Sequence, residues 1–283
     1  MAFKPRFINV RGNLIDLSVP KVMGVINVTP DSFYKGSRIT TEEGIINTAS
    51  QMIEDGADII DIGGYSSRPG AANINTDEER SRVINAVKIV SREFPDAVIS
   101  IDTFRSEIAV EAVLEGGAGI INDISGGEAD KKMFHVVEKI QVPYIMMHMQ
   151  GIPGTMQENP VYDDVVADIL KWFGERIFRL QSMGVNDIII DPGFGFGKKA
   201  GHNFELLRHL GDFSIAGLPL LVGFSRKSMI WKTLGITPDE ALNGTSVLNT
   251  VALMNGADIL RVHDVKEAVQ VVKLVEELKN SRI

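Results

Sequence analysis

The sequence predicts an α/β protein with the fold of a (β/α)8 TIM barrel, and two patterns in its 283 residues lead to this prediction. Short runs rich in Val and Ile recur along the whole chain and hardly alternate with polar residues, which is typical of parallel strands covered on both faces. Longer amphipathic stretches separate these runs and have the spacing of helices. Eight strands alternating with helices close into a barrel, for which about 250 residues suffice.

The elements are expected in a regular order along the chain. A turn at residues 11–13, Arg-Gly-Asn, separates two short apolar runs and predicts a short N-terminal β-hairpin over residues 6–18, closing the bottom of the barrel. The strands are predicted at Lys21–Val28, Asp58–Ile62, Ala97–Ile101, Gly119–Ile121, Val142–Met147, Asp187–Ile190, Pro219–Gly223 and Ala257–Val262. Helices are predicted, among others, at Glu42–Asp55, Asp77–Phe94, Asp163–Met183 and Val265–Lys279.

A weak internal repeat supports the barrel. Residues 54–61, Glu-Asp-Gly-Ala-Asp-Ile-Ile-Asp, resemble residues 115–122, Glu-Gly-Gly-Ala-Gly-Ile-Ile-Asn. In each, a helix is expected to end at a Gly that can adopt the left-handed conformation, and a strand follows almost at once. A doubly wound open sheet is the alternative, but no change in composition marks the switch point that it requires. Because no linker or low-complexity tract is visible, residues 1–283 are expected to form a single domain.

Composition argues against several classes of function. A formal net charge of −8 lacks the basic character of a nucleic-acid-binding protein, and the absence of Cys removes disulfides, thiolate metal sites and a Cys nucleophile. No apolar run approaches the ~18 residues of a membrane span, and no apolar signal-peptide core is visible at the N-terminus. We therefore expect a cytoplasmic protein that binds neither nucleic acid nor membranes, and that binds any anionic substrate through a local cluster of Lys and Arg.

Polar residues stand at the carboxyl end of each predicted strand, where barrels of this kind carry their active sites. Any one of them could merely end a strand or cap a helix, but their recurrence at every strand favours a functional site. Several of the loops after these strands are dense in Gly, Pro and hydroxyl residues, which also favours a working surface. The strand-end residues are Asn27, Asp61, Asp102, Asn122 with Asp123, His148, Asp191, Ser225 with Lys227, and Arg261 with His263.

These strand ends and loops resemble the motifs of the dihydropteroate synthase family of pterin-binding enzymes. The similar segments are, in chain order, Met23–Phe33, Asp61–Gly64 with Ser66–Gly70, Ser100–Thr103, Ile121–Ile124, Met147–Met149, Asp191–Lys198, Ser225–Ser228 and Arg261–Val265. The resemblance covers nearly the whole chain. The sequence departs from the family pattern at Tyr65, where Glu is common, at Phe104, where a small hydroxyl residue is usual, and at Ser67, where Thr is frequent.

The resemblance implies a transferase of folate biosynthesis. It would condense 6-hydroxymethyl-7,8-dihydropterin diphosphate with p-aminobenzoate, giving 7,8-dihydropteroate and diphosphate by a dissociative (SN1-like) substitution. Enzymes of this family need Mg2+ and usually form homodimers, so both are expected. Sulfonamides mimic p-aminobenzoate and are expected to be competitive inhibitors.

The resemblance also implies roles for particular residues. The pterin would be bound by Asp102, Asn122, Met147, Asp191 and Lys227. The diphosphate would be bound by Asn27, Arg68, Arg261 and His263, with Asn27 as the protein ligand of Mg2+. Ser67, Pro69, Phe194 and Ser228 would bind p-aminobenzoate. Asp102, Asp191, Lys227, Arg261 and His263 are expected to act in catalysis, and His148 is expected to be a structural histidine.

Two other functions stay open at this point. A methyltetrahydrofolate-to-corrinoid methyltransferase would share the pterin-facing Asp and Asn groups, but it would not need the residues implied for diphosphate at 225–228 and 261–263. A non-catalytic paralogue that only binds pterins or a partner protein would retain the fold, and fold alone does not define function.

Overall fold

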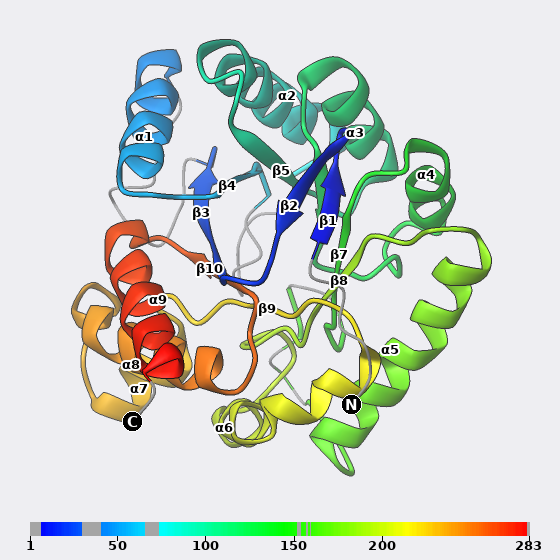
Figure 1. Ribbon diagram of the computed structural model, residues 1–283. Helices are drawn as coiled ribbons and strands as arrows, with labels where there is room; N and C mark the ends of the chain where they lie inside the picture. The colour runs from blue at the N-terminus through cyan, green and yellow to red at the C-terminus, as the bar shows by residue number, and fades with distance from the viewer. Residues whose placement is uncertain are drawn as a thin grey trace.

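The computed structural model describes residues 7–29, 41–65, 74–151, 154–156, 158 and 160–281. Eight parallel strands form the central sheet, in the order β8-β7-β6-β5-β4-β3-β10-β9, and helices surround it (Figure 1). The strands are β3 (Lys21–Asn27), β4 (Ile59–Gly63), β5 (Val98–Asp102), β6 (Ile120–Asp123), β7 (Tyr144–Met147), β8 (Ile188–Asp191), β9 (Leu221–Val222) and β10 (Ile259–Val262). A parallel bridge between Ile190 and Leu220 connects the two ends of this order, so the sheet closes on itself.

The predicted barrel is therefore confirmed, and the open doubly wound sheet is wrong. Each predicted strand overlaps an observed one, although β9 is only two residues long. The helical elements are α1 (Glu42–Glu54), α2 (Thr76–Glu93), α3 (Ser106–Glu111), η2 (Ala112–Gly116), α4 (Met133–Ile140), α5 (Val165–Ser182), α6 (Ala200–Arg208), η3 (Leu210–Ala216), α7 (Ser228–Leu234), η4 (Pro238–Glu240), α8 (Leu242–Met254) and α9 (Val265–Asn280). No helix in the described ranges is long and apolar enough to cross a membrane.

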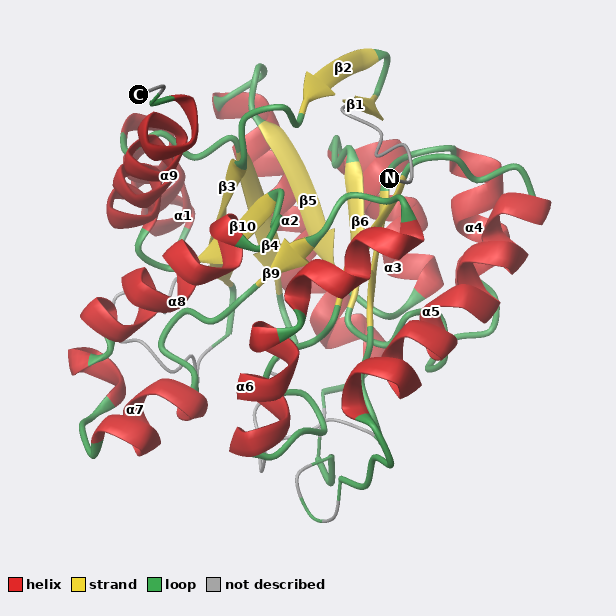
Figure 2. Ribbon diagram, turned by 60° about the horizontal axis from the view of Figure 1, so that its bottom comes forward, coloured by secondary structure: helices red, strands yellow, loops and turns green. Residues whose placement is uncertain are grey.

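The N-terminal hairpin closes the amino end of the barrel, as predicted. Strands β1 (Phe7–Val10) and β2 (Asn13–Asp16) pair antiparallel, and Arg11 and Gly12 turn the chain with φ of 53° and 89°. Positive φ at both central residues is the geometry of a type I′ turn, which is common in two-residue hairpins. Figure 2 shows the hairpin at one end of the barrel and the long loops at the other. Its apolar residues join one buried cluster with Leu17, Met23, Ile59, Ile120, Ile145, Ile189, Leu221 and Ile259.

The two-residue period of the strands explains how this cluster positions the site. Side chains two positions apart in a strand point to the same face of the sheet. A residue two positions after a member of this buried cluster therefore also faces the barrel interior. Beyond Ile59 the chain places Asp61, and beyond Ile259 it places Arg261. The same step leads to Asn122 from Ile120, to Met147 from Ile145 and to Asp191 from Ile189. An apolar floor therefore lies beneath a mostly polar layer at the carboxyl ends of the strands.

Candidate active site

Four strands bring their polar residues together around the guanidinium of Arg261. Its Nε donates to Asp61 Oδ2 at 2.7 Å, and its Nη2 donates to Asp102 Oδ2 at 2.7 Å. Asn122 Nδ2 donates to the same Asp61 oxygen at 3.1 Å. Residues from β10, β4, β5 and β6 thus form one connected network inside the barrel mouth.

Asp61 is the member of this network to which sequence reasoning assigned no role. Its side chain is fully buried, and its Oδ1 has no hydrogen-bond partner among the residues that the structure describes. A buried carboxylate is costly unless it is paired, so the contacts of Asp61 with Arg261 and Asn122 account for its position. The signal was present in the sequence, because Asp61 ends a predicted strand as the assigned residues do.

The charges of the network shift the pKa values of its members. Burial raises the pKa of Asp102 to about 7; Arg261 opposes this shift, while the negative charges of Asp61, Glu79 and Asp123 add to it. Burial disfavours the charged form of Arg261, but Asp61 and Asp102 outweigh that effect, so the pKa of Arg261 is raised. Arg261 therefore stays a cation, whereas Asp102 titrates near neutral pH.

Asp191 and Lys227 form a second charged pair of the site, and they interact electrostatically. Burial raises the pKa of Asp191, and the charge of Lys227 opposes that shift. Burial lowers the pKa of Lys227 to about 8, against the attraction of Asp191. Lys227 Nζ donates to the carbonyl of Phe194 at 2.5 Å and lies 4.7 Å from the centre of the Phe196 ring. Asp191 Oδ1 accepts from the backbone N–H of Gly193 at 2.7 Å.

Two glycines make room for these side chains. At Gly63, an added Cβ would lie 3.3 Å from the Cβ of Asp102, so the missing side chain leaves space for that residue. Gly193 has a φ of 71°, and an added Cβ would lie only 2.0 Å from the carbonyl oxygen of His148. The loop after β8 can therefore approach the end of β7 only because residue 193 is Gly.

His263 lies beside Arg261 and contacts Ser225. Its Nδ1 is 2.9 Å from Ser225 Oγ, and its backbone N–H donates to the same oxygen at 3.1 Å. Burial lowers the pKa of His263 to about 4, and the charge of Arg261 adds to this effect. At neutral pH His263 is therefore an uncharged imidazole, which can offer an N–H group to an anion but adds no positive charge.

His148 is tied to the buried amine of Lys198, which holds two loops together. Lys198 Nζ lies 3.0 Å from His148 Nδ1 and donates to the carbonyls of Gly193 and Phe196, each at 2.9 Å. Burial lowers the pKa of His148 to about 2, and the charge of Lys198 adds to the effect. These contacts support the structural role that we expect for His148.

The two Phe residues of the loop after β8 differ in burial. The ring of Phe194, which we expected to contact p-aminobenzoate, is fully buried, and its centre lies 4.4 Å from that of Phe224. Phe196 is only partly buried, and it packs against an apolar cluster that contains Met147. Phe196, which sequence reasoning did not select, is the aromatic ring that lies beside Lys227.

The remaining predicted residues lie at the edge of the site or outside the described ranges. Asn27 is the last residue of β3 and is paired in register with Gly63, beside Asp102. Ser228 is the first residue of α7. Ser67, Arg68 and Pro69 lie outside the described residues. Within the described ranges, no group of three or more His, Cys, Asp or Glu residues could hold a metal ion.

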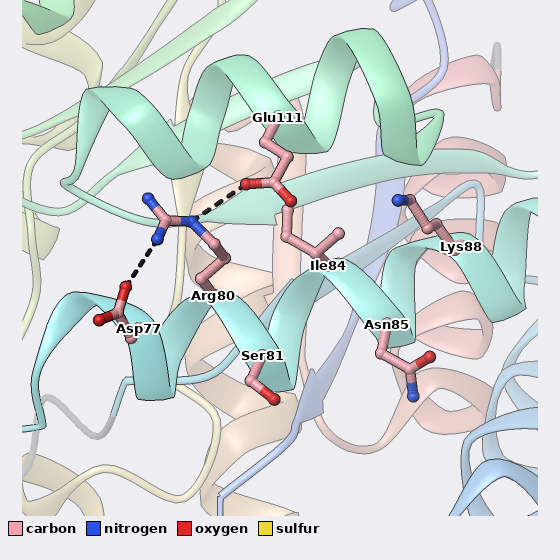
Figure 3. Close-up of a pocket in the computed structure, with 7 residues that line it drawn as sticks. All are labelled: Asp77, Arg80, Ser81, Ile84, Asn85, Lys88 and Glu111. Atoms are coloured by element: carbon pink, nitrogen blue, oxygen red, sulfur yellow. Dashed lines mark hydrogen bonds and ion pairs between the residues drawn. The ribbon is translucent and has the colours of Figure 1, made fainter.

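A surface cavity on the outside of the barrel is separate from this network. Figure 3 shows it between α2 and α3, with Arg80 reaching toward Asp77 and Glu111. Its other lining residues are Ser81, Ile84, Asn85 and Lys88, and none of the predicted site residues is among them.

Comparisons with known proteins agree with the fold. The family model described as "Pterin binding enzyme" matches residues 23–263. The dihydropteroate synthase of Escherichia coli K12 is 45% identical over 268 residues, which cover 94% of each chain. That of Haemophilus influenzae is 39% identical over 94% of this chain and 97% of the relative.

Solved structures of dihydropteroate synthases have the same fold. That of Yersinia pestis in complex with a sulfonamide drug superposes with a TM-score of 0.93 at 41% identity, covering 97% of this chain and 100% of the other. That of Xanthomonas albilineans in complex with 7,8-dihydropteroate superposes with a TM-score of 0.86 at 34% identity, covering 98% and 100%.

The chain forms a barrel, and the family model of pterin binding enzymes covers most of its length. Relatives that match this chain along nearly its whole length narrow the class further. The chain belongs to the dihydropteroate synthase family, whose members are transferases.

Proposed function

We propose that the protein condenses 6-hydroxymethyl-7,8-dihydropterin diphosphate with p-aminobenzoate to give 7,8-dihydropteroate and diphosphate. The observation that carries this proposal is the network in which Arg261 lies between Asp61 and Asp102. This network places a permanent cation, Arg261, beside carboxylate and amide groups in one barrel mouth. The cation suits an anionic leaving group, and the carboxylate and amide groups suit a polar ring.

The pterin ring is recognised by groups that match its donors and acceptors. Asp191 accepts from ring amino and N–H groups, and Lys227 donates to the ring carbonyl. One N–H of Asn122 Nδ2 donates to Asp61, so Asn122 offers its carbonyl oxygen and its second N–H to the substrate. Met147, buried among Ile124, Met149 and Met156, supplies an apolar surface for the ring. If one of these protein groups were missing, a polar group of the bound pterin would stay unpaired, at a cost of about 1–3 kcal/mol.

The diphosphate is bound at the side of Arg261 and His263, with Arg68 as a further cation. Asn27 is the protein ligand that we propose for Mg2+. A single neutral amide oxygen fits this ion, because Mg2+ keeps several waters and otherwise binds phosphate oxygens. The neighbouring carboxylates of Asp61 and Asp102 each pair with Arg261 through one oxygen. Bound Mg2+ would neutralise charge on the leaving diphosphate.

The proposed chemistry is a dissociative substitution at the methylene carbon of the pterin. The bond from that carbon to the diphosphate oxygen breaks first, and the electron pair leaves with diphosphate. Asp102 and Asp191 favour the positive charge that then spreads over the pterin. The aryl nitrogen attacks the methylene carbon and loses one proton to water. Arg261 stabilises the leaving group, and positioning supplies much of the remaining rate enhancement.

The p-aminobenzoate site is proposed around Phe196, Lys227 and Ser228. The Phe196 ring beside Lys227 replaces Phe194 as the apolar face. Ser228 opens α7, where backbone N–H groups favour a carboxylate. Ser67 and Pro69 complete this proposed site, and sulfonamides are proposed to compete for it. We further propose a cytoplasmic homodimer with a single domain in each chain.

The decisive experiment measures diphosphate release by the purified protein with Mg2+ and the dihydropterin diphosphate, with and without p-aminobenzoate. Release that depends on p-aminobenzoate and yields dihydropteroate supports the proposal. An Arg261→Met variant that still folds is the matched control and should release none. Pterin binding without release would overturn the proposal, and a change in corrinoid absorbance on adding methyltetrahydrofolate would then indicate the methyltransferase.

A further inference from the structure

Arg226 stands between two residues of the candidate site, Ser225 and Lys227, in the loop that joins β9 to α7. Its φ is 54°, in the left-handed region that residues other than Gly seldom adopt. Such a conformation persists where the surrounding structure determines it. The contacts of Arg226 therefore bear on its own backbone and on the directions in which its two neighbours leave the chain.

The guanidinium of Arg226 is paired with the carboxylate of Asp264, which follows His263 in the chain. Arg226 Nε donates to Asp264 Oδ2 at 3.0 Å, and Nη2 donates to Oδ1 at 2.8 Å. Only 9% of the Arg226 side chain and 12% of the Asp264 side chain are exposed to solvent. Two parallel hydrogen bonds fix the relative orientation of the two groups, and their burial limits screening by salt. This pair joins the loop after β9 to the loop after β10.

Further contacts hold Arg226 from the side of η4 and α8. Its Nη1 donates to the carbonyls of Pro238 at 3.0 Å and of Asp239 at 2.6 Å. Its backbone N–H donates to the buried hydroxyl of Thr245 at 3.1 Å, and that hydroxyl donates to the carbonyl of Ala241 at 2.9 Å. Other elements thus hold both the backbone and the side chain of Arg226, which accounts for its positive φ.

The Arg226–Asp264 pair adjoins, along the chain, the contact that the two loops make in the site. Ser225 precedes Arg226 and His263 precedes Asp264, and Ser225 Oγ lies 2.9 Å from His263 Nδ1. Lys227 follows Arg226 directly. A shift of either loop would therefore move Lys227 and His263 relative to each other.

We propose that Arg226 and Asp264 are positioning residues, which join the loops after β9 and β10 and thereby hold Lys227 and His263 in place relative to each other. In the proposed function Lys227 binds the pterin and His263 binds the diphosphate. A substrate that carries both groups meets both residues at once, so its turnover depends on their relative position. This inference rests on the proposed function for its effect on turnover, but not for its effect on the two loops.

The test removes the guanidinium without disturbing the turn. Arg226→Gly leaves a residue that adopts a φ of 54° at little cost, so the variant reports on the side chain. Added guanidinium chloride, at concentrations well below those that unfold proteins, should restore its activity by pairing with Asp264. Arg226→Gly combined with Asp264→Asn avoids an unpaired buried charge and should not be rescued. The matched control is Arg80→Met, which breaks ion pairs with Asp77 and Glu107 outside the barrel.

The first readout is hydrogen exchange of the backbone amides of residues 224–228 and 263–266 in the substrate-free protein. We expect faster exchange over both ranges in the single and double variants, and wild-type exchange in Arg80→Met. Guanidinium should slow exchange again in Arg226→Gly alone.

The second readout compares the complete substrate with its two parts. We expect kcat/KM for the dihydropterin diphosphate to fall about tenfold to a hundredfold in Arg226→Gly, as misplaced binding groups cause. Affinities for 6-hydroxymethyl-7,8-dihydropterin alone and for inorganic pyrophosphate alone should change much less, because each part meets only one of the two loops. Arg80→Met should behave as the wild type in all three measurements.

Wild-type exchange over both ranges in folded Arg226→Gly would overturn the inference. Equal losses for the complete substrate and for each part would also overturn it, because general damage to the site would then explain them. So would rescue by guanidinium in the double variant, since the rescue would not involve Asp264. If Arg226→Gly does not fold, Arg226→Lys replaces it, because a single ammonium cannot reproduce the planar fork, and unchanged exchange and kcat/KM there would refute the proposal.

Failure of the proposed function is distinguishable from failure of this inference. If the wild-type protein makes no dihydropteroate, the proposed function fails. The exchange measurement still decides whether Arg226 and Asp264 join the two loops, because it needs no substrate.

Discussion

Arg261 is held by Asp61, whose fully buried Oδ2 accepts from the guanidinium Nε at 2.7 Å. The same oxygen accepts from Asn122, so one carboxylate links the proposed diphosphate side of the site to the pterin side. Asp61 therefore orients the side chains of both Arg261 and Asn122.

We expect Asp61→Asn to lower kcat by about tenfold to a thousandfold, because a misdirected Arg261 stabilises the leaving group less well. The KM for p-aminobenzoate should change little. Steady-state kinetics of the variant, with Asp77→Asn as an exposed control, will measure both effects. A folded Asp61→Asn protein with wild-type kcat would restrict Asp61 to a packing role.

The pH dependence of kcat/KM should be a narrow bell. Asp102, with a pKa raised to about 7, must be ionised and is so above that pH, whereas Lys227, with a pKa lowered to about 8, must be protonated and is so below that pH. Lys227→Arg should remove the alkaline limb at about 8, and an alkaline limb that persists there would assign it to another group.

The acid limb should move when the charge at residue 61 is removed. Asp102 faces Arg261, Asp61, Glu79 and Asp123, and the charge of Asp61 is one of those that raise its pKa. In Asp61→Asn the pKa of Asp102 falls, so the acid limb shifts to lower pH. A pH–rate profile measured beside that of Asp77→Asn tests this, and an unmoved limb would show that another group titrates there.

Phe194 and Phe196 should respond differently to substitution by Ala. Phe194→Ala empties a fully buried position and should lower the free energy of unfolding by about 3–5 kcal/mol. Phe196→Ala should cost less stability and raise the KM for p-aminobenzoate. Urea denaturation and steady-state kinetics will measure both effects, and each variant is the control for the other. A higher KM for p-aminobenzoate in Phe194→Ala and a larger loss of stability in Phe196→Ala would indicate Phe194 as the ligand-facing ring.

Tyr65 and Phe104 should be coupled in stability. Their rings meet edge to face at 5.0 Å and share Arg105, so a double-mutant cycle with Tyr65→Leu and Phe104→Leu should give about 0.5–1.5 kcal/mol. The control cycle pairs Tyr65→Leu with Leu278→Ala, an exposed residue of α9, and should be additive. Additivity in the first cycle would mean that the two rings do not interact energetically.

The barrel was predictable because its signals are local. Unbroken Val and Ile runs mark strands buried on both faces, and the residues of β4 and β10 point inward in steps of two from Ile59 and Ile259. The same period placed Asp102, Asn122, Asp191 and Arg261 at the strand ends, where the structure brings them to one mouth. This part of the site is a consequence of the strands, whose geometry is regular.

Features that lack a sequence period could be decided only by the tertiary structure. In the segment Gly193-Phe194-Gly195-Phe196-Gly197 all three glycines have positive φ, so the chain is neither helix nor strand there. Without a regular period, the sequence does not tell which Phe enters the core. Asp61 pairs with Arg261, which lies 200 residues away in the chain, and such a pairing inside the barrel has no local signature. The sequence by itself determined the barrel and the polar strand ends, because neighbouring residues mark where a buried strand runs and where it ends. The tertiary structure alone decided which of those polar groups bind each other, because that depends on how eight strands close.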